Sequence, residues 1–359
     1  MSGGNLLPCS SPSLIQSKKM TCKVVMTSCA CLLFLLSLFG SGHGESLSSA
    51  RKVASPTCQR VFVTSESSWP DPLQNCDCSS GATIVTGYFN IGNQSKHDEQ
   101  KLFSWSKSFL ELPDNMIVFT DTFTLRSILS ARSVSTGCTL VILQDIFSTQ
   151  LGRTIDWSRQ HSLDPESDTH SPELYVIWNQ KSMWLAESAT KNPFQSTHFF
   201  WADAGQFRDK DFLASYVTSK EKWISAHDFI PSCRILVLAI EHFTESELRL
   251  DNEGHAQPLS ALHVRLGGGN FGGDLCAVKK WKNLFLEQLD WYMLNGAFIG
   301  KDQPMYGSIC IEHQEMCFIV DGPLVRETKD VWFAMQPVLH GVTVPVPQYK
   351  IPLTREHEA

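Results

Sequence analysis

The chain has 359 residues, of which 42% are hydrophobic and 19% are charged. This composition is typical of a globular protein with a sizeable core, and it excludes a largely disordered chain. The formal net charge of −7 provides no general basic field, so we expect no nucleic-acid partner.

The N-terminus resembles a targeting signal. Lys18, Lys19 and Lys23 precede an uncharged apolar run over residues 24–39, and small polar residues follow at 40–44. This order fits a cleaved signal peptide or, because the run is short for a bilayer span, a short signal anchor. The positive flank stays cytoplasmic, so both alternatives place the remaining chain in the ER or Golgi lumen or outside the cell. Without cleavage, residues 24–39 would hold a single-pass type II protein on the membrane.

The cysteines are compatible with this compartment. Eight of the 12 follow the apolar run, and an even number in an oxidising lumen predicts disulfides. The sequence does not indicate the pairs, and free buried thiols are the alternative. The eight are Cys58, Cys76, Cys78, Cys138, Cys233, Cys276, Cys310 and Cys317.

The chain divides into a linker and one domain. Residues 45–80 are rich in Ser, Pro and Gly, which predicts a stem, and a domain over 81–350 follows. Within it, short apolar runs alternate with segments of helical periodicity, which predicts an α/β domain with a largely parallel central sheet. Residues 145–172 are polar and mixed, which predicts an insertion or a long loop. We expect strands over 83–89, 115–121, 139–143, 197–202 and 234–240, and helices over 101–112, 122–132, 181–189 and 281–293.

Polar residues stand at the carboxyl ends of three expected strands. They are Asn90, Asp121 and Asp203. Ligands of open α/β sheets bind outside the carboxyl ends of strands, so we expect these residues near one ligand. The residues before Asn90 that would border the same ligand are Thr86, Gly87 and Tyr88.

Asp203 is also a candidate metal ligand, because small residues follow it and leave room. A carboxylate there can bind Mn²⁺ or Mg²⁺, and the ion can bridge two phosphates. The alternative is a carboxylate that caps a turn or pairs with Arg208. Three basic residues near expected strand ends are candidate phosphate contacts, namely Lys181, Arg126 and Arg132.

Two further segments are candidates for ligand contact. Five of the seven residues 267–273 are glycine, which predicts a loop whose amides approach a ligand at the start of the following helix. A flexible loop without a ligand is the alternative. After that helix, Asp302 can act as a base, with Lys301 and Gln303 beside it. The glycines assigned to ligand contact are Gly268, Gly269, Gly272 and Gly273.

These motifs occur in the same order in the HtrL/YibB family, which the chain resembles over roughly residues 82–320. The family in turn resembles glycosyltransferases of the GT-A type, in which a strand ends in an Asp-x-Asp-like metal site. The quoted motifs are Thr83–Gly92, Trp178–Lys181, Asn192–Phe194, Phe200–Gly205 with Arg208, Gly268–Gly273 and Gly300–Gln303.

The resemblance implies a single GT-A-like domain, a nucleotide-sugar donor and a glycan or glycoconjugate acceptor. It implies Mn²⁺ or Mg²⁺ as the cofactor, with Asp203 and the late His340 as ligands, and it makes Asp302 the carboxylate on the acceptor side. Here one aspartate stands where many transferases have two. That departure motivates the alternative of a non-catalytic carbohydrate-binding protein, secreted or membrane-anchored, on the same fold.

Overall fold

The computed structural model describes residues 61–73, 76, 81–91, 99–208 and 221–352. The predicted targeting segment and much of the predicted linker lie outside the described residues. Among the residues that are described, no helix combines the length and the apolar character that a membrane span requires.

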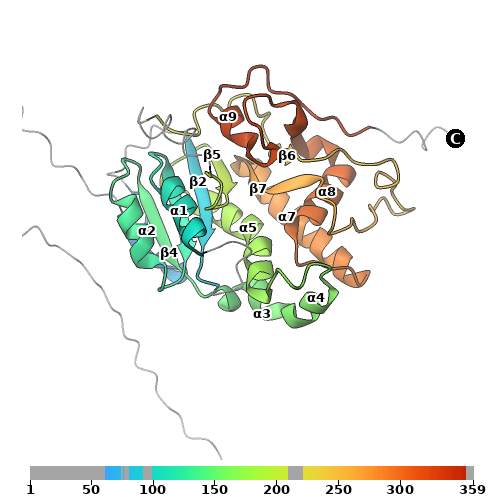
Figure 1. The fold of residues 1–359 in the computed structure, drawn as a ribbon, viewed down its shortest axis with the longest axis horizontal. Coiled ribbons are helices and arrows are strands. Elements are labelled where there is room, and N and C mark those ends of the chain that lie inside the picture. Colours follow the sequence, from blue (N-terminus) through green and yellow to red (C-terminus); the bar gives the residue numbers. More distant parts are fainter. Residues whose placement is uncertain (1–60, 74–75, 77–80, 92–98, 209–220, 353–359) are drawn as a thin grey trace, which may run out of the picture. The chain divides into compact units, whose positions relative to one another are not determined.

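An eight-stranded sheet forms the centre of the domain, with the order β1-β4-β3-β2-β5-β7-β6-β8 (Figure 1). Every neighbouring pair is parallel except those of β7, which runs antiparallel between β5 and β6. The predicted α/β class with a largely parallel sheet is therefore confirmed. The strands are β1 (Val61–Ser65), β2 (Ala82–Tyr88), β3 (Asn115–Thr120), β4 (Thr139–Leu143), β5 (His198–Ala202), β6 (Ile235–Ala239), β7 (Leu266–Asp274) and β8 (Cys317–Asp321).

Helices cover both faces of the sheet, because successive strand side chains point to opposite faces. Phe199 and Trp201 of β5 pack on the face covered by α5, α7 and α8, whereas Phe200 and Ala202 pack on the face of α1, α2 and α9. In Figure 1, α1 and α2 lie side by side, as do α7 and α8. The helices are α1 (Glu99–Leu110), α2 (Leu125–Arg132), α3 (Gln150–Thr154), α4 (Trp157–Leu163), α5 (Pro172–Lys191), α7 (Leu275–Leu294), α8 (Asp302–Glu312) and α9 (Met335–Leu339).

The folded elements extend into segments predicted to be irregular. Strand β1 lies within the predicted linker, where it pairs with β4 at the edge of the sheet. Of the two alternatives for 145–172, an insertion or a long loop, the loop is wrong, because the segment contains α3 and α4. Their N-termini are capped by the side chains of Thr149 and Asp156, which accept from backbone N–H groups one turn on and so stabilise two short polar helices.

The glycine-rich segment is a central strand, so the predicted loop is also wrong there. β7 pairs with β5 on one side and with β6 on the other. Glycine usually weakens a strand, but here the backbones of the neighbouring strands lie too close to leave room for a side chain. A Cβ at Gly272 would lie 2.2 Å from the carbonyl oxygen of Phe199, and one at Gly273 would lie 2.6 Å from that of Arg234.

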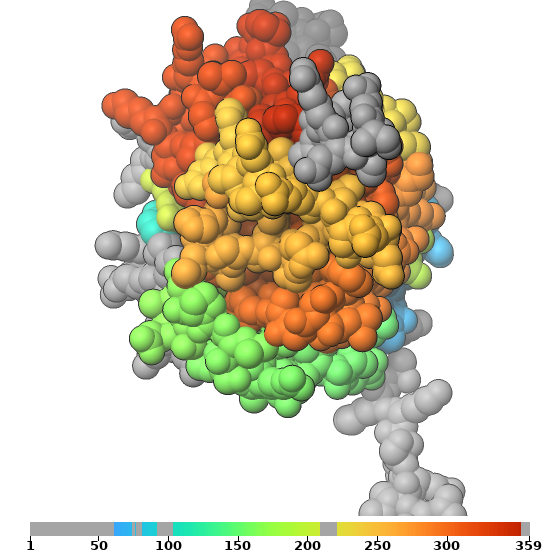
Figure 2. Space-filling model, turned by 90° about the vertical axis from the view of Figure 1, so that its right-hand side faces the viewer, coloured from blue at the N-terminus to red at the C-terminus, as the bar shows by residue number. Residues whose placement is uncertain are grey.

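The connection from β6 to β7 packs against α7 and α8 and lies across the middle of one face of the domain (Figure 2, amber beside orange). The N–H of Ala256 donates to Glu312 over 2.8 Å, and the N–H of Leu259 donates to the hydroxyl of Tyr292 over 2.9 Å. Side chains of both helices therefore hold this connection in place.

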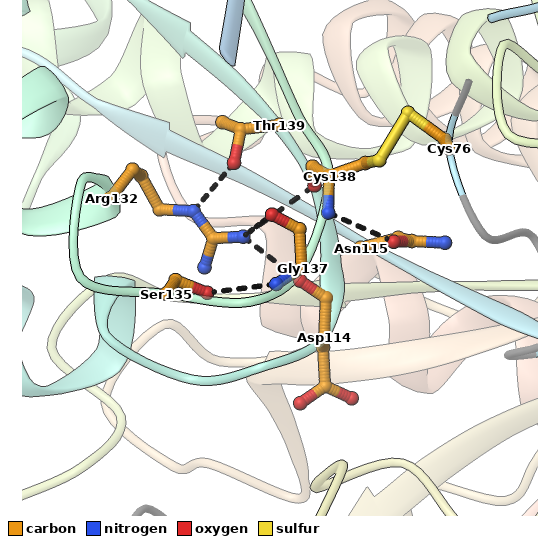
Figure 3. Close-up of a disulfide and its surroundings, with 8 residues drawn as sticks. All are labelled: Cys76, Asp114, Asn115, Arg132, Ser135, Gly137, Cys138 and Thr139. Atoms are coloured by element: carbon orange, nitrogen blue, oxygen red, sulfur yellow. Dashed lines mark hydrogen bonds between the residues drawn. A yellow bond between two sulfur atoms is a disulfide. The ribbon is translucent and has the colours of Figure 1, made fainter. Parts of the chain in front are cut away.

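Arg132 is a buried structural residue, which argues against the suggested phosphate contact. Its guanidinium donates to the hydroxyl of Thr139 over 2.6 Å (Figure 3) and to the carbonyl oxygens of Leu110, Leu112 and Asp114 over 2.7–2.9 Å. Burial lowers the pKa of Arg132 to about 10, against the opposing effect of the Asp114 carboxylate. The cation thus joins the end of α1 to the starts of β3 and β4.

Among the described residues, three disulfides are present, and they identify pairs that the sequence left open. They join Cys76 to Cys138 (Figure 3), Cys233 to Cys276, and Cys310 to Cys317. Cys58 and Cys78 lie outside the described residues. Such bonds persist in oxidising compartments, so they point to an extracytoplasmic location.

Candidate functional site

The sheet brings the end of β5 and the start of β7 to the same edge, because these neighbours run antiparallel. A cavity of about 530 Å³ opens at this edge. It is lined by Gly87, Tyr88, Phe89, Ile91, Leu174, Ile177, Trp178, Lys181, Trp201, Asp203, Ala204, Gly205, Gln206, Arg208, Leu238, Gly267, Gly268, Gly269, Asn270, Asp302, Gln303, Asp330, Trp332 and Phe333.

A lysine and two carboxylates meet in the cavity wall. Nζ of Lys181, from α5, lies 3.2 Å from Oδ1 of Asp203 and 3.1 Å from Oδ2 of Asp302. It also donates to the carbonyl oxygen of Gly268 over 3.0 Å. Asp203 follows β5, and Asp302 begins α8, so three separate elements supply this cluster. The side chain of Asp203 is 41% exposed, whereas those of Lys181 and Asp302 are both 3% exposed.

The burial of this cluster shifts its proton equilibria. Burial opposes the charge of Lys181, but Asp203 and Asp302 outweigh it and raise the pKa of the lysine above its ordinary value. Burial is the largest effect on Asp302 and raises the pKa of its carboxyl, with Lys181 acting in the opposite direction. Lys181 therefore remains a cation near neutral pH, while Asp302 binds a proton more readily than an exposed carboxylate.

Two glycines of β7 make room for the carboxylates. A Cβ at Gly268 would lie 2.6 Å from Oδ2 of Asp302, and one at Gly269 would lie 3.4 Å from Oδ2 of Asp203. The strand bulges here, because Leu236 of β6 pairs with Gly272 while Leu238 pairs with Gly267. The bulge interrupts the regular pairing of β7 with β6 beside the carboxylates, a position at which bulges often re-aim groups near a site.

Aromatic rings form much of the remaining wall. Tyr88, Phe89, Trp178, Trp332 and Phe333 line the cavity together with the cluster. Such rings supply apolar area and flat faces on which a sugar or a nucleobase can stack.

The lining residues include two cations, Lys181 and Arg208. The guanidinium of Arg208 lies 4.4 Å from the ring centre of Trp105 and 5.5 Å from that of Phe333. Its Nε donates to the carbonyl oxygen of Gly205 over 3.1 Å. These contacts hold an exposed positive charge at the mouth of the cavity.

Buried polar contacts support the cluster from behind. The hydroxyls of Ser182 and Tyr306 lie 3.2 Å apart, and burial followed by the charge of Asp302 raises the pKa of Tyr306 well above its ordinary value. The neutral phenol therefore persists beside Asp302 at all physiological pH values.

A second buried group stands behind Trp178. The carboxylate of Asp164 accepts from His170 over 2.8 Å and from the hydroxyl of Tyr175 over 2.7 Å. The ring of His170 meets Trp178 edge-on at 5.0 Å. This contact fixes one wall of the cavity.

The structure brings together about half of the residues predicted from sequence. The ones that line the cavity come from five separate segments of the chain. They are Gly87, Tyr88, Lys181, Asp203, Gly268, Gly269, Asp302 and Gln303.

The other predicted residues lie away from the cavity wall. Thr86 is fully buried in the sheet, and Gly272 and Gly273 serve strand packing. Oδ2 of Asp121 accepts from the N–H of Asn90 over 2.7 Å, and its Oδ1 accepts from N–H groups at the start of α2, so this carboxylate orders two loops.

Lys301 and His340 are also elsewhere. The ammonium of Lys301 contacts Glu166 and donates to the carbonyl oxygen of Ala261 over 2.8 Å, which ties the start of α8 to the β6–β7 connection. His340 follows α9, with Nδ1 3.3 Å from the carbonyl oxygen of Trp223. Neither residue lines the cavity, so the structure does not place His340 with Asp203 as a second metal ligand.

Sequence reasoning missed several lining residues. Asn270 stands inside the glycine segment and Trp178 inside a quoted motif, yet neither was assigned to the site. Trp332 and Phe333 belong to a short 3₁₀ helix (Val331–Phe333) that Asp330 caps, beyond β8, a strand that the sequence analysis does not predict. A polar residue among glycines was the one signal available for Asn270.

The residues present fit a divalent metal poorly at the position between the carboxylates. The ammonium of Lys181 already lies there and contacts both Asp203 and Asp302. Within the described residues, the one group of three ligand-type side chains is Cys233, Asp274 and Cys276, whose cysteines form a disulfide.

Comparisons with known proteins show what the chain is similar to. A search of curated proteins found no match. Among solved structures, the apo form of mouse xyloside xylosyltransferase 1 matches with a TM-score of 0.38 and 11% sequence identity. The match covers 67% of this chain and 85% of that chain.

The family model HtrL_YibB, described as a bacterial protein of unknown function, matches residues 80–335. The match includes β2 to β8 and every cluster residue named above. The chain therefore belongs to the HtrL/YibB family.

Proposed function

We propose that the protein is a glycosyltransferase that moves a sugar from a nucleotide-sugar donor to a glycan or glycoconjugate acceptor. The observation that carries this proposal is the meeting of Lys181, Asp203 and Asp302 in one aromatic-walled cavity at the carboxyl edge of the sheet. Such an edge is where α/β folds bind nucleotides and related ligands.

The chemistry assigns a role to Asp302, Arg208 and Asp203. The acceptor hydroxyl oxygen attacks the anomeric carbon of the donor while its proton passes to the carboxylate of Asp302. The bond between that carbon and the diphosphate oxygen breaks, and its electron pair leaves with the diphosphate. Arg208 stands at the cavity mouth to stabilise the leaving anion, and Asp203 orients the donor through its exposed carboxylate oxygen.

The experiment tests binding before turnover. Full-length protein is screened against a panel of nucleotide sugars by thermal shift, and each hit is assayed for hydrolysis and transfer. We expect Asp302→Asn to bind the donor with turnover lowered about a hundredfold or more, as for loss of a general base. We expect Asp203→Asn to lose donor binding. Asp121→Asn is the control, since that carboxylate lies off the cavity. No binding to any nucleotide sugar would overturn the proposal.

A non-catalytic carbohydrate-binding protein is the second candidate. The aromatic lining favours it, and one aspartate follows β5 where transferases of this kind often have two. A glycan array separates the two functions. Glycan binding without affinity for any nucleotide, and unchanged in Asp302→Asn, would support this candidate over the transferase.

We also propose that the domain lies in the lumen of the ER or Golgi, as a single-pass type II membrane protein or a secreted one. The N-terminal order of lysines and apolar residues supports this location, as do the three disulfides. Protease protection of a C-terminal tag in microsomes tests it, and N-terminal sequencing of the mature chain distinguishes an anchor from a cleaved signal.

A further inference from the structure

Lys181 has the contacts of a built-in cation. An ammonium carries three N–H donors, and here it has three oxygen neighbours at 3.0–3.2 Å, from Gly268, Asp203 and Asp302. The ammonium donates to the carbonyl oxygen of Gly268 and forms ion pairs with the carboxylates of Asp203 and Asp302 in the wall of the cavity. The lysine cannot swing out to a ligand without leaving two carboxylates unpaired, so its charge is a fixed part of the site.

This position is the one that a divalent ion would take in a site built from the same carboxylates. Hard cations such as Mn²⁺ and Mg²⁺ bind carboxylate and carbonyl oxygens, which is the donor set around Nζ of Lys181. In the described part of the chain, no third carboxylate or histidine completes a metal-type group with Asp203 and Asp302. The ammonium of Lys181 already contacts both carboxylates and the carbonyl oxygen of Gly268.

The surroundings keep the lysine charged. Its side chain is 3% exposed, and the two carboxylates more than offset the burial, so the pKa of Lys181 stays above its ordinary value. A permanent cation of this kind lowers the negative potential of the cavity wall. An anionic ligand can then approach Asp203 without an added ion.

We infer that Lys181 replaces a divalent metal in this cavity, so that the site binds its nucleoside-diphosphate ligand without Mn²⁺ or Mg²⁺. The inference deepens the proposed function, because it names the cation of that same site. The inferred site differs from that of GT-A transferases, in which an Asp-x-Asp-like motif at the end of a strand binds the metal.

Removal of the lysine charge tests this by creating a metal site. Lys181→Met keeps most of the length of the side chain, one atom short, but leaves Asp203 and Asp302 unneutralised. Mn²⁺ alone is titrated into full-length protein, and the electron paramagnetic resonance signal of free Mn²⁺ reports the bound ion. We expect no saturable site in the cavity of the wild type. In K181M we expect one saturable Mn²⁺ site, at least about tenfold tighter than the weak, unsaturated binding of Mn²⁺ to the wild type, the scale of effects seen when the surroundings of a metal site change.

Two matched controls assign the bound ion to this cluster. The double variant K181M/D302N lacks one of the two carboxylates and should lose the new Mn²⁺ site. K181R keeps a cation and should not gain it. Mn²⁺ should also raise the Tm of K181M and leave the Tm of the wild type unchanged, which gives a second readout that needs no substrate.

The outcomes separate this inference from the proposed transfer reaction. Saturable Mn²⁺ binding to the wild type that D203N abolishes would overturn the inference, and so would failure of folded K181M to gain a site. If K181M does not fold, the wild-type titration decides alone. Sugar transfer that requires Mn²⁺ would leave the proposed function standing and remove the inference. If K181M gains a Mn²⁺ site but the protein binds no nucleotide, the inference about Lys181 would stand and the proposed function would fail.

Discussion

The indole Nε1 of Trp201 donates a hydrogen bond of 2.7 Å to Oδ1 of Asp203, two residues further along the chain. The ring of Trp201 is buried in the sheet, so the strand itself orients the carboxylate that follows it. Oδ1 is also the oxygen nearer to Lys181, which directs Oδ2 towards Gly269.

Trp201→Phe should loosen this carboxylate while the aromatic packing is largely kept. We expect a fall in unfolding free energy of about 1 kcal/mol for the lost hydrogen bond, and weaker nucleotide-sugar binding because Asp203 is no longer fixed. Isothermal titration and urea unfolding measure the two effects. Trp281→Phe is the matched control, because the buried Nε1 of Trp281 has no hydrogen-bond partner among the residues that the structure describes. Equal effects of both changes on binding would contradict the orienting role.

Gly268→Ala should displace Asp302. The added Cβ would lie 2.6 Å from Oδ2 and 2.7 Å from Oδ1 of a carboxylate that Lys181 holds in place. We expect turnover to fall sharply and stability to drop by about 1–3 kcal/mol, the range for overpacked sites.

Gly269→Ala provides the comparison on the same strand. The nearest atoms to its Cβ are the side-chain oxygens of Gln206 at 3.3 Å and Asp203 at 3.4 Å, which can shift slightly. Thermal denaturation and turnover should therefore change less than in Gly268→Ala. A larger effect at Gly269 would contradict the geometry around Asp302.

Transfer should show an acid limb set by Asp302. Burial, partly opposed by Lys181, raises the folded pKa of this carboxyl above its ordinary 3.8. The base form exists above that folded pKa, so kcat/KM is lost as the pH falls through it. Lys181 keeps its proton over this range because its pKa is also raised, so the limb belongs to Asp302.

The pH profile of kcat/KM, compared between wild type and Asp302→Asn, measures this limb. The asparagine variant should have low residual turnover with no acid limb. A limb of the same midpoint in both proteins would assign the titration to another group, whereas Asp121→Asn should retain the wild-type profile.

Arg132→Met should be strongly destabilising. The change removes the donors for the carbonyl groups of Leu110, Leu112 and Asp114 and leaves these oxygens buried without their partner. We expect a loss of about 3–5 kcal/mol, as when one partner of a buried charged contact is removed. Arg126→Met on the exposed face of the same helix is the control and should change stability by at most about 0.5 kcal/mol. Urea unfolding distinguishes these values.

The three disulfides should differ in their contribution to stability, because they close loops of different length. Their sequence separations are 62 for Cys76–Cys138, 43 for Cys233–Cys276 and 7 for Cys310–Cys317. Loop-closure entropy gives about 4 kcal/mol for each of the first two and about 2 kcal/mol for the third. Double Cys→Ala variants, compared by denaturant unfolding, measure this order. The greatest loss from the Cys310–Cys317 pair would contradict the loop-length argument.

The local sequence pattern predicted much of the sheet. It failed for the glycine-rich β7, whose structure depends on contacts with residues distant in the sequence, and for the polar helices α3 and α4. Strand β4 begins and ends where its apolar run indicated, over Thr139–Leu143. The segment of β7 was predicted as a loop, because glycine propensity favours loops and nothing local shows that neighbouring strands exclude a Cβ. The capping side chains of Thr149 and Asp156 were the local signal for α3 and α4 that composition alone obscured.

By itself, the sequence determined the alternation of strands and helices, the family, and the candidate chemistry of Lys181, Asp203 and Asp302, because apolar periodicity and residue type are local properties. Only the tertiary structure decided that these three side chains touch, that β7 is antiparallel and that Arg132 is buried. Those facts depend on strand order and helix packing, which bring together residues more than a hundred positions apart and are set by the whole core.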